Sequence, residues 1–351
     1  MRVPVSPAGL GAAALVGLAI GLARRRPRRD ARLRHAVVTG GSRGLGYALA
    51  EELLARGVRV SICGRDELAL ARAREALVER GEVRAVRADL ADPEQLDRFL
   101  REAREANGPV DLLVNNAAVI QVGPLETTHY EDYERTLRIN FLAPLRLVLA
   151  VLPEMRERRF GRIVNICSVG GRVSMPHLLP YSASKFALTG FSEGLRAELA
   201  GTGVAVTTVC PGLTRTGSPR HAEFRGRPRA EHSWFAVSDS LPVLSRDARS
   251  TARRIVDAAF RGEADVLTTL PAHLATPLHA FFPGLTADVL GLMNRFLLPR
   301  APAEGADSAR GRESRSRWAP SLLTRLGDRA ARELNQEPAG PGSDEPVPEL
   351  P

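Results

Sequence analysis

Short apolar runs alternate with longer amphipathic stretches along most of this chain, and the alternation limits the folds it can adopt. The stretches between the runs have the spacing of amphipathic helices, and the longest lies at 130–158. Strands that are almost wholly apolar are buried on both faces. The pattern therefore predicts an α/β fold, a doubly wound parallel sheet with helices on both faces. The predicted strands lie at 36–38, 58–63, 83–88, 110–114, 163–167, 204–209 and 266–268.

Composition changes at both ends of this pattern. Residues 1–32 hold an uncharged stretch followed by arginines. From about residue 300, Pro, Gly, Ser, Arg and Glu dominate without a long apolar period. A segment of that kind buries too little apolar surface to offset the entropy lost on ordering. We therefore expect an N-terminal segment at 1–32, a single catalytic domain at 33–299 and a disordered tail at 300–351.

Residues 3–23 carry no charge and are just long enough to cross a bilayer core, which needs about 20 apolar residues. Six arginines follow between Arg24 and Arg32, whereas the positive charge of a signal peptide precedes its apolar run. Arginines beside a span stay on the cytoplasmic side. The sequence favours membrane contact through residues 3–23, spanning or at the interface, with a cytoplasmic catalytic domain. A loose apolar N-terminus on a cytoplasmic protein is the alternative.

The net charge of +9 does not indicate a nucleic-acid partner. Arginine is spread along the chain, and neither a zinc-ligand spacing nor an aromatic–basic ribonucleoprotein motif is present. The three cysteines, Cys63, Cys167 and Cys210, each end an apolar run, and none belongs to a C-x-x-C pair. We expect reduced, buried thiols. No nucleic acid and no metal is expected.

Lysine occurs once. Of the 49 Lys and Arg residues, 48 are arginine, and the exception is Lys185. It follows Tyr181 by four residues, so a helix here places both side chains on one face. Lysine is a compact cation, whereas arginine presents a wide planar fork. The exception therefore indicates a site that accepts only the small cation beside the phenol.

Such a pair predicts proton transfer. A phenol titrates at about 10 in water, and a cation about 4 Å away at an effective dielectric of about 20 contributes about 4 kcal/mol. We therefore expect Lys185 to lower the pKa of Tyr181 toward neutrality. There the phenol can serve as a general acid or base toward an oxygen atom.

A glycine-rich turn, Thr39-Gly40-Gly41-Ser42-Arg43-Gly44-Leu45-Gly46, follows the first predicted strand and opens the first helix. Glycines allow a tight turn and let a pyrophosphate approach the helix N-terminus, where N–H groups and the dipole favour an anion. In this context the turn predicts a dinucleotide site in a Rossmann fold.

With the turn and Tyr-x-x-x-Lys, residues 33–260 resemble the short-chain dehydrogenase/reductase family. Alanine at 118 stands where the family has glycine. The resemblance implies hydride transfer between nicotinamide and a carbonyl or alcohol carbon. It also implies that Tyr181 moves the proton and that Ser168 and Tyr181 stabilise charge on the oxygen. Further matches are Asp89-Leu90, Asn115-Asn116-Ala117-Ala118, Asn140, Ser168 and Pro211-Gly212-Leu213-Thr214-Arg215-Thr216.

The resemblance implies two sets of site residues. Asn140, whose counterpart holds a proton-relay water, joins Ser168, Tyr181 and Lys185 as the catalytic set. Lys185 also donates to the ribose hydroxyls. The cofactor set is Gly40, Ser42, Arg43, Gly44, Leu45, Gly46, Arg65, Asp89, Leu90, Asn116, Ala117, Tyr181, Lys185, Pro211, Gly212, Thr214 and Thr216.

The end of the second strand bears on the choice of cofactor. NAD-selective members of the family carry an acid there for the ribose hydroxyls, whereas this chain has Gly64. Arg65 and Arg43 could both face a 2′-phosphate, which a guanidinium binds well. We expect NADP(H), with NAD(H) as the alternative.

The substrate is bounded only in class. Residues 213–244 carry Phe224, Trp234 and Phe235 and are expected to form a loop over the pocket. Residues 273–298, rich in Leu and Phe, predict a helix or helix pair. It could pack in the core, form a dimer face or dip into a membrane. We expect a small lipophilic substrate and a homo-oligomer.

Two other classes of function stay open. A catalytically silent NADP(H)-binding sensor or scaffold would bind the cofactor without turnover. A membrane-tethered interaction protein would act through the arginine run and the tail. Silent members of the family usually lose the tyrosine or the lysine, and this chain keeps its only lysine there. We therefore prefer the enzyme.

Overall fold

The structure is a computed structural model, and it describes residues 33–302, 307–314 and 316–336. The predicted membrane segment at 3–23 and the arginine run after it lie outside the described residues.

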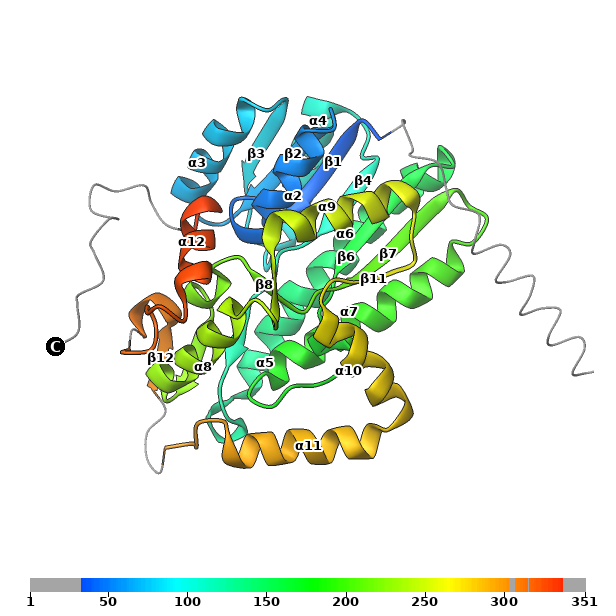
Figure 1. The fold of residues 1–351 in the computed structure, drawn as a ribbon. Coiled ribbons are helices and arrows are strands. Elements are labelled where there is room, and N and C mark those ends of the chain that lie inside the picture. The colour runs from blue at the N-terminus through cyan, green and yellow to red at the C-terminus, as the bar shows by residue number, and fades with distance from the viewer. Residues whose placement is uncertain (1–32, 303–306, 315, 337–351) are drawn as a thin grey trace, which may run out of the picture.

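Seven parallel strands form the central sheet, in the order β11-β7-β6-β4-β1-β2-β3 (Figure 1). The chain winds outward from β1 in both directions, since Val38 is in register with Ile62 of β2 and Val114 of β4. The predicted doubly wound sheet is confirmed, with strand ends shifted by at most two residues. The strands are β1 His35–Thr39, β2 Arg59–Gly64, β3 Val83–Arg87, β4 Leu112–Asn115, β6 Gly161–Ile166, β7 Val204–Cys210 and β11 Asp265–Leu267.

Helices cover both faces of this sheet, and each face buries an apolar cluster of its own (Figure 1). Leu49 and Leu53 pack with Ile255 on one face, and Phe99 packs with Leu147 on the other. This two-sided burial explains why the strands are apolar at nearly every position. The first face carries α2 (Gly44–Leu54), α3 (Glu67–Val78) and α9 (Ala248–Arg261); the second carries α4 (Pro93–Asn107), α6 (Ala143–Glu157) and α7 (Leu179–Glu198).

One described helical stretch, Tyr130–Glu157, is long and apolar enough to cross a membrane by length and composition. It consists of α5 (Tyr130–Leu137), a π-helical turn (Arg138–Leu142) and α6. Leu147, Val148, Val151 and Met155 of this stretch are buried in the cluster under the sheet. Packing within the domain therefore accounts for its apolar character.

The segment 213–244 is more regular than the predicted loop. It forms strands and a helix, and one of its strands is the middle strand of a small sheet with the order β12-β9-β5. Its elements and their partners are β8 Leu213–Arg215, β9 Glu223–Gly226, α8 Pro228–Ser240, β5 Gln121–Val122, β10 Ser245–Asp247 and β12 Asp307–Arg310.

The prediction of a disordered tail is wrong for residues 307–314 and 316–336. They form β12, a 3-10 turn (Gly311–Glu313) and α12 (Arg325–Glu333), which lie on the domain (Figure 1). The segment has no long apolar period, but Ala331 and Leu334 are buried and anchor it. Residues 337–351 lie outside the described residues.

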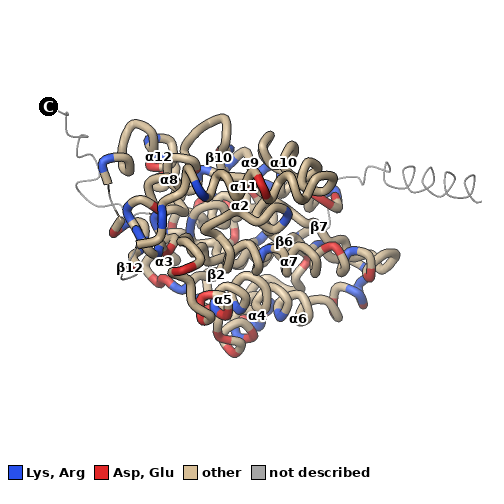
Figure 2. Tube along the Cα trace, turned by 90° about the horizontal axis from the view of Figure 1, so that it is seen from below, with Lys and Arg blue, Asp and Glu red and all other residues tan. Residues whose placement is uncertain are grey.

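Residues 273–298 belong to a helix pair, α10 (Leu270–Phe281) and α11 (Pro283–Phe296), that lies below the sheet in Figure 1. The pair does not fill the core, since α10 buries only Ala272 and α11 buries no residue. One acid and one base, Asp288 and Arg295, are its only charged residues apart from histidine, and its tube is mostly tan in Figure 2. The pair presents an exposed apolar surface.

Candidate active site

The sequence motifs converge at the carboxyl edge of the sheet. The glycine-rich turn follows β1, Asn116 follows β4, Ser168 follows β6 and Pro211 follows β7. Because the strands are parallel, all four ends share one edge, which is where ligands bind in doubly wound folds.

The glycine-rich turn folds tightly against the first helix. Gly40 has a φ of +65°, a conformation that favours glycine, and a Cβ on Gly46 would collide with the Gly40 carbonyl oxygen. Asn116 donates through Nδ2 to the Thr39 carbonyl oxygen at 2.9 Å, and its N–H donates to Thr39 Oγ1 at 2.9 Å. These bonds hold the ends of β1 and β4 together.

Ser168, Tyr181 and Lys185 lie together at this edge. Tyr181 and Lys185 are one turn apart in α7, and the Ser168 side chain lies near enough to the phenol to lower its pKa. Lys185 is only 2% exposed. Its Nζ donates to the Ile166 carbonyl oxygen at 2.8 Å and lies 5.8 Å from the centroid of the Tyr181 ring.

The expected lowering of the Tyr181 pKa is wrong for this structure. Burial raises the pKa of Tyr181 to about 12, and the hydrogen bond with Ser168 opposes only part of that effect. Burial also lowers the pKa of Lys185 to about 8. The expectation rested on attraction between the Lys185 ammonium and the Tyr181 phenolate. Removing each charged form from water has the larger effect on its pKa.

Asn140 lies in the π-helical turn between α5 and α6 and is fully buried. Its Oδ1 accepts from the Val119 N–H at 2.8 Å, and its Nδ2 donates to the Val119 carbonyl oxygen at 3.0 Å and to Ser184 Oγ at 2.9 Å. Asn140 thus connects the segment after β4 to α7, beside Lys185. π-turns of this kind are frequent at functional sites, and the helical periodicity of the sequence did not predict one.

Four arginines surround the other end of the glycine-rich turn, and we call Arg43, Arg65, Arg72 and Arg310 the arginine cluster. Burial first, and then the charges of Arg65, Arg310 and Arg72, lower the pKa of Arg43, while Asp66 opposes them. The Asp66 carboxylate lies 4.0 Å from the Arg43 guanidinium. Positive charge therefore dominates at this end.

The remaining predicted residues lie around the same edge. Thr214 and Thr216 are buried after β7, and Asp89 and Leu90 are partly buried after β3. The Pro211 carbonyl oxygen accepts from the Val169 N–H at 2.8 Å, which joins the Pro-Gly segment to the Ser168 turn. In the part of the chain that the structure describes, no group of three or more His, Cys, Asp or Glu could hold a metal ion.

Sequence reasoning missed His221 and the residues 334–336, which contact the glycine-rich turn or Arg43. Arg43 Nη1 lies 3.1 Å from a ring nitrogen of His221, and the Gly44 N–H donates to the Leu334 carbonyl oxygen at 2.9 Å. Nothing in the polar tail sequence indicated these contacts.

The profile described as short chain dehydrogenase matches residues 34–223 of this sequence. The chain belongs to the short-chain dehydrogenase/reductase family. It is accordingly an oxidoreductase acting on CH–OH and C=O groups, with a cofactor of the NAD(P)(H) class.

Similar proteins include the dehydrogenase/reductase SDR family member 7B of Mus musculus, 34% identical over 270 residues, or 74% of this chain and 82% of the relative. The 3-dehydrosphinganine reductase of Danio rerio is 34% identical over 188 residues, or 52% of this chain and 57% of the relative. The crystal structure of a short-chain dehydrogenase from Streptomyces avermitilis has a TM-score of 0.64 at 30% identity, covering 76% of this chain and 99% of that one.

Proposed function

We propose that this short-chain dehydrogenase/reductase transfers hydride between NADP(H) and the carbonyl or alcohol group of a lipophilic small molecule, with Tyr181 as general acid and base. The main support is the meeting of Ser168, Tyr181 and the buried Lys185 at the sheet edge where the glycine-rich turn begins.

The residues around the turn fit a dinucleotide. Helix geometry leaves the N–H groups of Leu45 and Gly46, in the first turn of α2, without intrahelical partners. These groups and the helix dipole suit a pyrophosphate. The proposed cofactor residues Asn116, Thr214 and Thr216 lie at the same edge, and we propose that Lys185 donates to a ribose when the cofactor is bound. When bound, the nicotinamide supplies or accepts the hydride.

The proton chemistry follows from the pKa values of the two central groups. In the direction of reduction, Tyr181 donates its proton to the substrate oxygen, and a pKa of about 12 keeps the phenol protonated at neutral pH. Ser168 donates a hydrogen bond to the same oxygen. Lys185, with a pKa of about 8, is charged below that pH and stabilises the phenolate that the transfer leaves.

The preference for NADP(H) over NAD(H) rests on the arginine cluster. Arg65 is exposed, and Gly64 leaves the end of β2 without a carboxylate. Among the described residues, Asp66 forms the salt bridge with Arg43. The same carboxylate caps α3 by accepting from the Ala69 N–H at 3.0 Å. The four guanidinium groups of the cluster outnumber the acids that contact its members, Asp66 and Glu313, and this excess of positive charge favours the extra phosphate of NADP(H).

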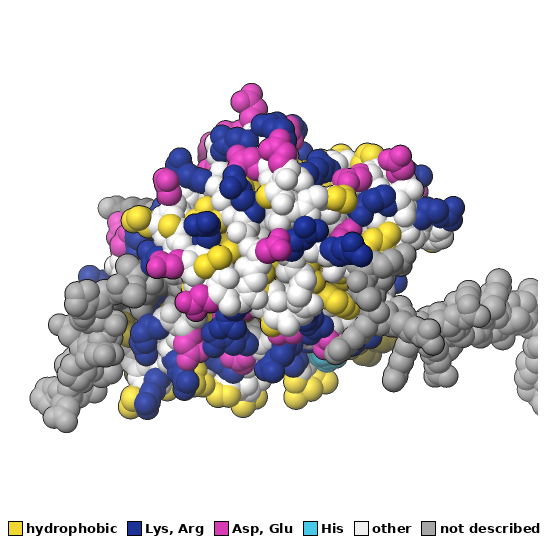
Figure 3. Space-filling view, turned by 90° about the horizontal axis from the view of Figure 1, so that it is seen from above, with side chains coloured by type: hydrophobic (Ala, Val, Ile, Leu, Met, Phe, Trp, Pro, Cys, Tyr) yellow, Lys and Arg dark blue, Asp and Glu magenta, His cyan; other side chains and the backbone are white. Residues whose placement is uncertain are grey.

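A lipophilic substrate and membrane contact are supported by the helix pair α10–α11. Ten large apolar side chains from it and its ends are exposed, which exceeds the scattered apolar exposure of an ordinary surface. By contrast, the side seen from above in Figure 3 mixes basic and acidic side chains with small hydrophobic patches, unlike the exposed apolar surface of the helix pair. We propose that this surface rests on a membrane held near by residues 3–23. The exposed residues are Leu270, Leu274, Leu278, Phe281, Phe282, Leu285, Val289, Leu292, Phe296 and Leu297.

The enzymatic part of the proposal is tested with a panel of ketones and aldehydes, including long-chain ones, followed at the nicotinamide absorbance with NADPH and with NADH. We expect turnover with NADPH on lipophilic members of the panel. Tight NADPH binding with no turnover on the whole panel would instead support the silent sensor or scaffold.

The membrane part is tested by fractionation of the full chain. We expect it to sediment with membranes and to resist high salt, because burial of apolar area is not screened. Adhesion of the arginine run to anionic lipid, at about 1 kcal/mol per basic residue, would be released by salt. Recovery of the full chain in the soluble fraction at low salt would end this part of the proposal.

A further inference from the structure

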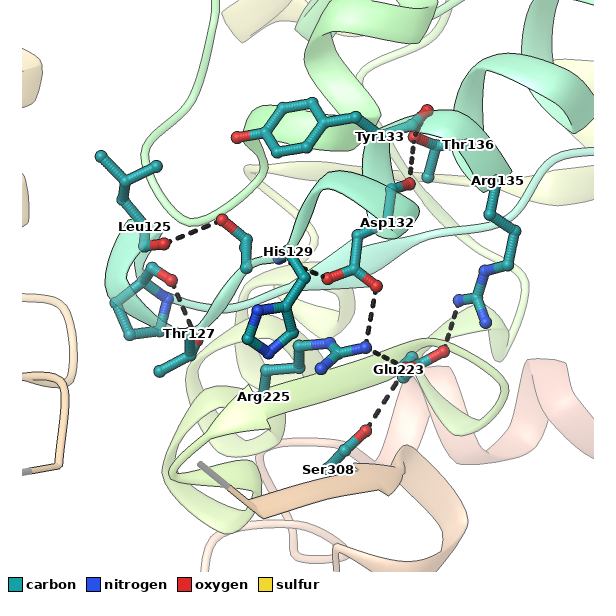
Figure 4. A network of polar contacts seen from close by, with 12 residues as sticks. Leu125, Thr127, His129, Asp132, Tyr133, Arg135, Thr136, Glu223, Arg225 and Ser308 are labelled. Atoms are coloured by element: carbon teal, nitrogen blue, oxygen red, sulfur yellow. Dashed lines mark hydrogen bonds and ion pairs between the residues drawn. The ribbon is translucent and has the colours of Figure 1, made fainter. Parts of the chain in front are cut away.

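The C-terminal segment, residues 307–336, crosses the domain and pairs with it. β12 runs antiparallel to β9, with Ala309 in register with Phe224. Figure 4 shows how this small sheet is tied to α5: Ser308 and Arg225 both contact Glu223, and Arg225 binds the Asp132 carboxylate at 2.8 Å. The beginning of the segment is therefore anchored to the domain by contacts of its own.

The helix of the segment, α12, is docked separately. Gly217 has a φ of +74°, and a Cβ on it would lie 2.5 Å from the Cβ of Ala331, so the two backbones approach closely. Arg220 binds Asp328 at 2.6 Å, with both side chains about one-fifth exposed. These contacts fix α12 without using the residues that follow it.

Those residues reach the glycine-rich turn. Besides the bond from Gly44 N–H to the Leu334 carbonyl oxygen, Asn335 donates through Nδ2 to the carbonyl oxygens of Ser42 at 2.7 Å and Ala69 at 2.8 Å. Its Oδ1 accepts from Arg72 Nε at 3.1 Å. Asn335 has a φ of +56°, a conformation that asparagine tolerates better than most residues.

Gln336 lies between the turn and the segment after β8. Its Nε2 donates to the Thr216 carbonyl oxygen at 2.8 Å and would lie 2.9 Å from a Cβ on Gly44. The residue is 9% exposed, and its buried Oε1 has no hydrogen-bond partner among the described residues. A buried acceptor without a partner suits a site that a hydrogen-bond donor completes.

The segment also adds to the charge at this end of the site. Arg310 belongs to the arginine cluster, and the Gln336 carbonyl oxygen lies 3.3 Å from Nε2 of His221, whose ring contacts Arg43. Burial, and next the charge of Arg43, lower the pKa of His221 to about 4, so the ring is neutral and can accept from Arg43 while donating to Gln336.

We propose that Asn335 and Gln336 are positioning residues of the cofactor site, which hold the glycine-rich turn and the Thr216 segment in the arrangement that receives NADP(H). The inference rests on the proposed cofactor. It makes the C-terminal segment part of the dinucleotide site, although the family profile ends at residue 223.

The test uses the full chain and the variants Asn335→Gly and Gln336→Ala. Glycine keeps the backbone conformation at 335 and removes the side-chain bonds. Arg329→Ala is the matched control, because the Arg329 side chain is 73% exposed, lies in the preceding helix α12 and pairs with Glu333 among the described residues. Affinity for NADPH is measured by calorimetry, together with the KM for NADPH, the KM for the carbonyl substrate and the melting temperature.

We expect the dissociation constant for NADPH to rise about tenfold in Asn335→Gly and a few-fold in Gln336→Ala, in line with the loss of three side-chain hydrogen bonds and of one. The KM for the carbonyl substrate and the affinity of Arg329→Ala should stay near the wild-type values. If the two residues only stabilise the fold, the variants should melt at a lower temperature. Their NADPH affinity, measured well below that melting temperature, should then equal that of the wild type.

Two outcomes overturn only this inference: unchanged NADPH affinity in both variants, or tighter binding, which would mean that the segment obstructs the site. Failure of the wild-type chain to bind NADPH or NADH overturns the proposed function and this inference with it.

Discussion

Three of the four proposed catalytic residues, Ser168, Tyr181 and Lys185, come from one strand–turn–helix unit of the chain, whereas the arginine cluster is gathered from residues 43 to 310. Lys185 is almost wholly buried, but Arg65 is exposed. Because the first region is buried, adding or removing a single proton or methylene group there should change activity or stability strongly. We expect the second region to bind the cofactor through charge, and such binding depends less on the exact side-chain position and is screened by salt.

Replacing Tyr181 with Phe tests the first region most severely. The change removes the proton donor while the ring stays, so we expect turnover to fall by about 10²–10⁴ with NADPH affinity nearly unchanged. Single-turnover kinetics and calorimetry measure the two quantities. Activity within a few-fold of wild type would show that another group supplies the proton.

The burial of Lys185 predicts a pH-dependent stability. Its pKa is about 8 in the folded chain, against 10.5 for a lysine in water, so between these pH values the unfolded chain binds more protons. Stability therefore rises with pH across this window, by about 1.4 kcal/mol per pH unit, or about 3 kcal/mol in all. Below about pH 8 the cost of burying the charge is fully present.

Denaturant unfolding of wild type and Lys185→Met at pH 7.5 and pH 10 isolates this contribution, because the other groups cancel in the difference. As the pH rises, the free energy of unfolding of the wild type should increase relative to that of the variant by up to about 3 kcal/mol. A constant difference would show that the lysine is not buried as a charge.

Lys185→Arg should lose most turnover, because the wide fork does not fit beside Ile166.

Arg65→Ala sharpens the comparison at the other end. A charged hydrogen bond to phosphate contributes about 1.5–3 kcal/mol, so we expect NADPH affinity to fall about ten- to a hundredfold while NADH affinity barely changes. Raising the salt concentration should reduce the difference between the two cofactors in wild type. Equal losses for both cofactors would mean that Arg65 acts on the fold.

Sequence patterns predicted the fold well because strand burial and helix periodicity are local properties. They also placed Tyr181 and Lys185 on one face, since that relation depends only on four-residue spacing. The expected pKa of Tyr181 was wrong because the rest of the fold buries both side chains. The effect of that burial on the pKa outweighs the attraction between the two charges. Asn335 could not be predicted as a neighbour of Ser42, because their contact depends on how the whole chain closes.

That last contact has a consequence for synthesis. The side chain of Asn335 bonds to the Ser42 carbonyl across 293 residues. At about 5–20 residues per second, a ribosome needs roughly 15–60 s to add that length of chain. Throughout this time the first βαβ unit is made but lacks the segment that covers its glycine-rich turn. A nascent chain cut short before residue 335 would therefore present the turn without the hydrogen bonds that residues 334–336 supply.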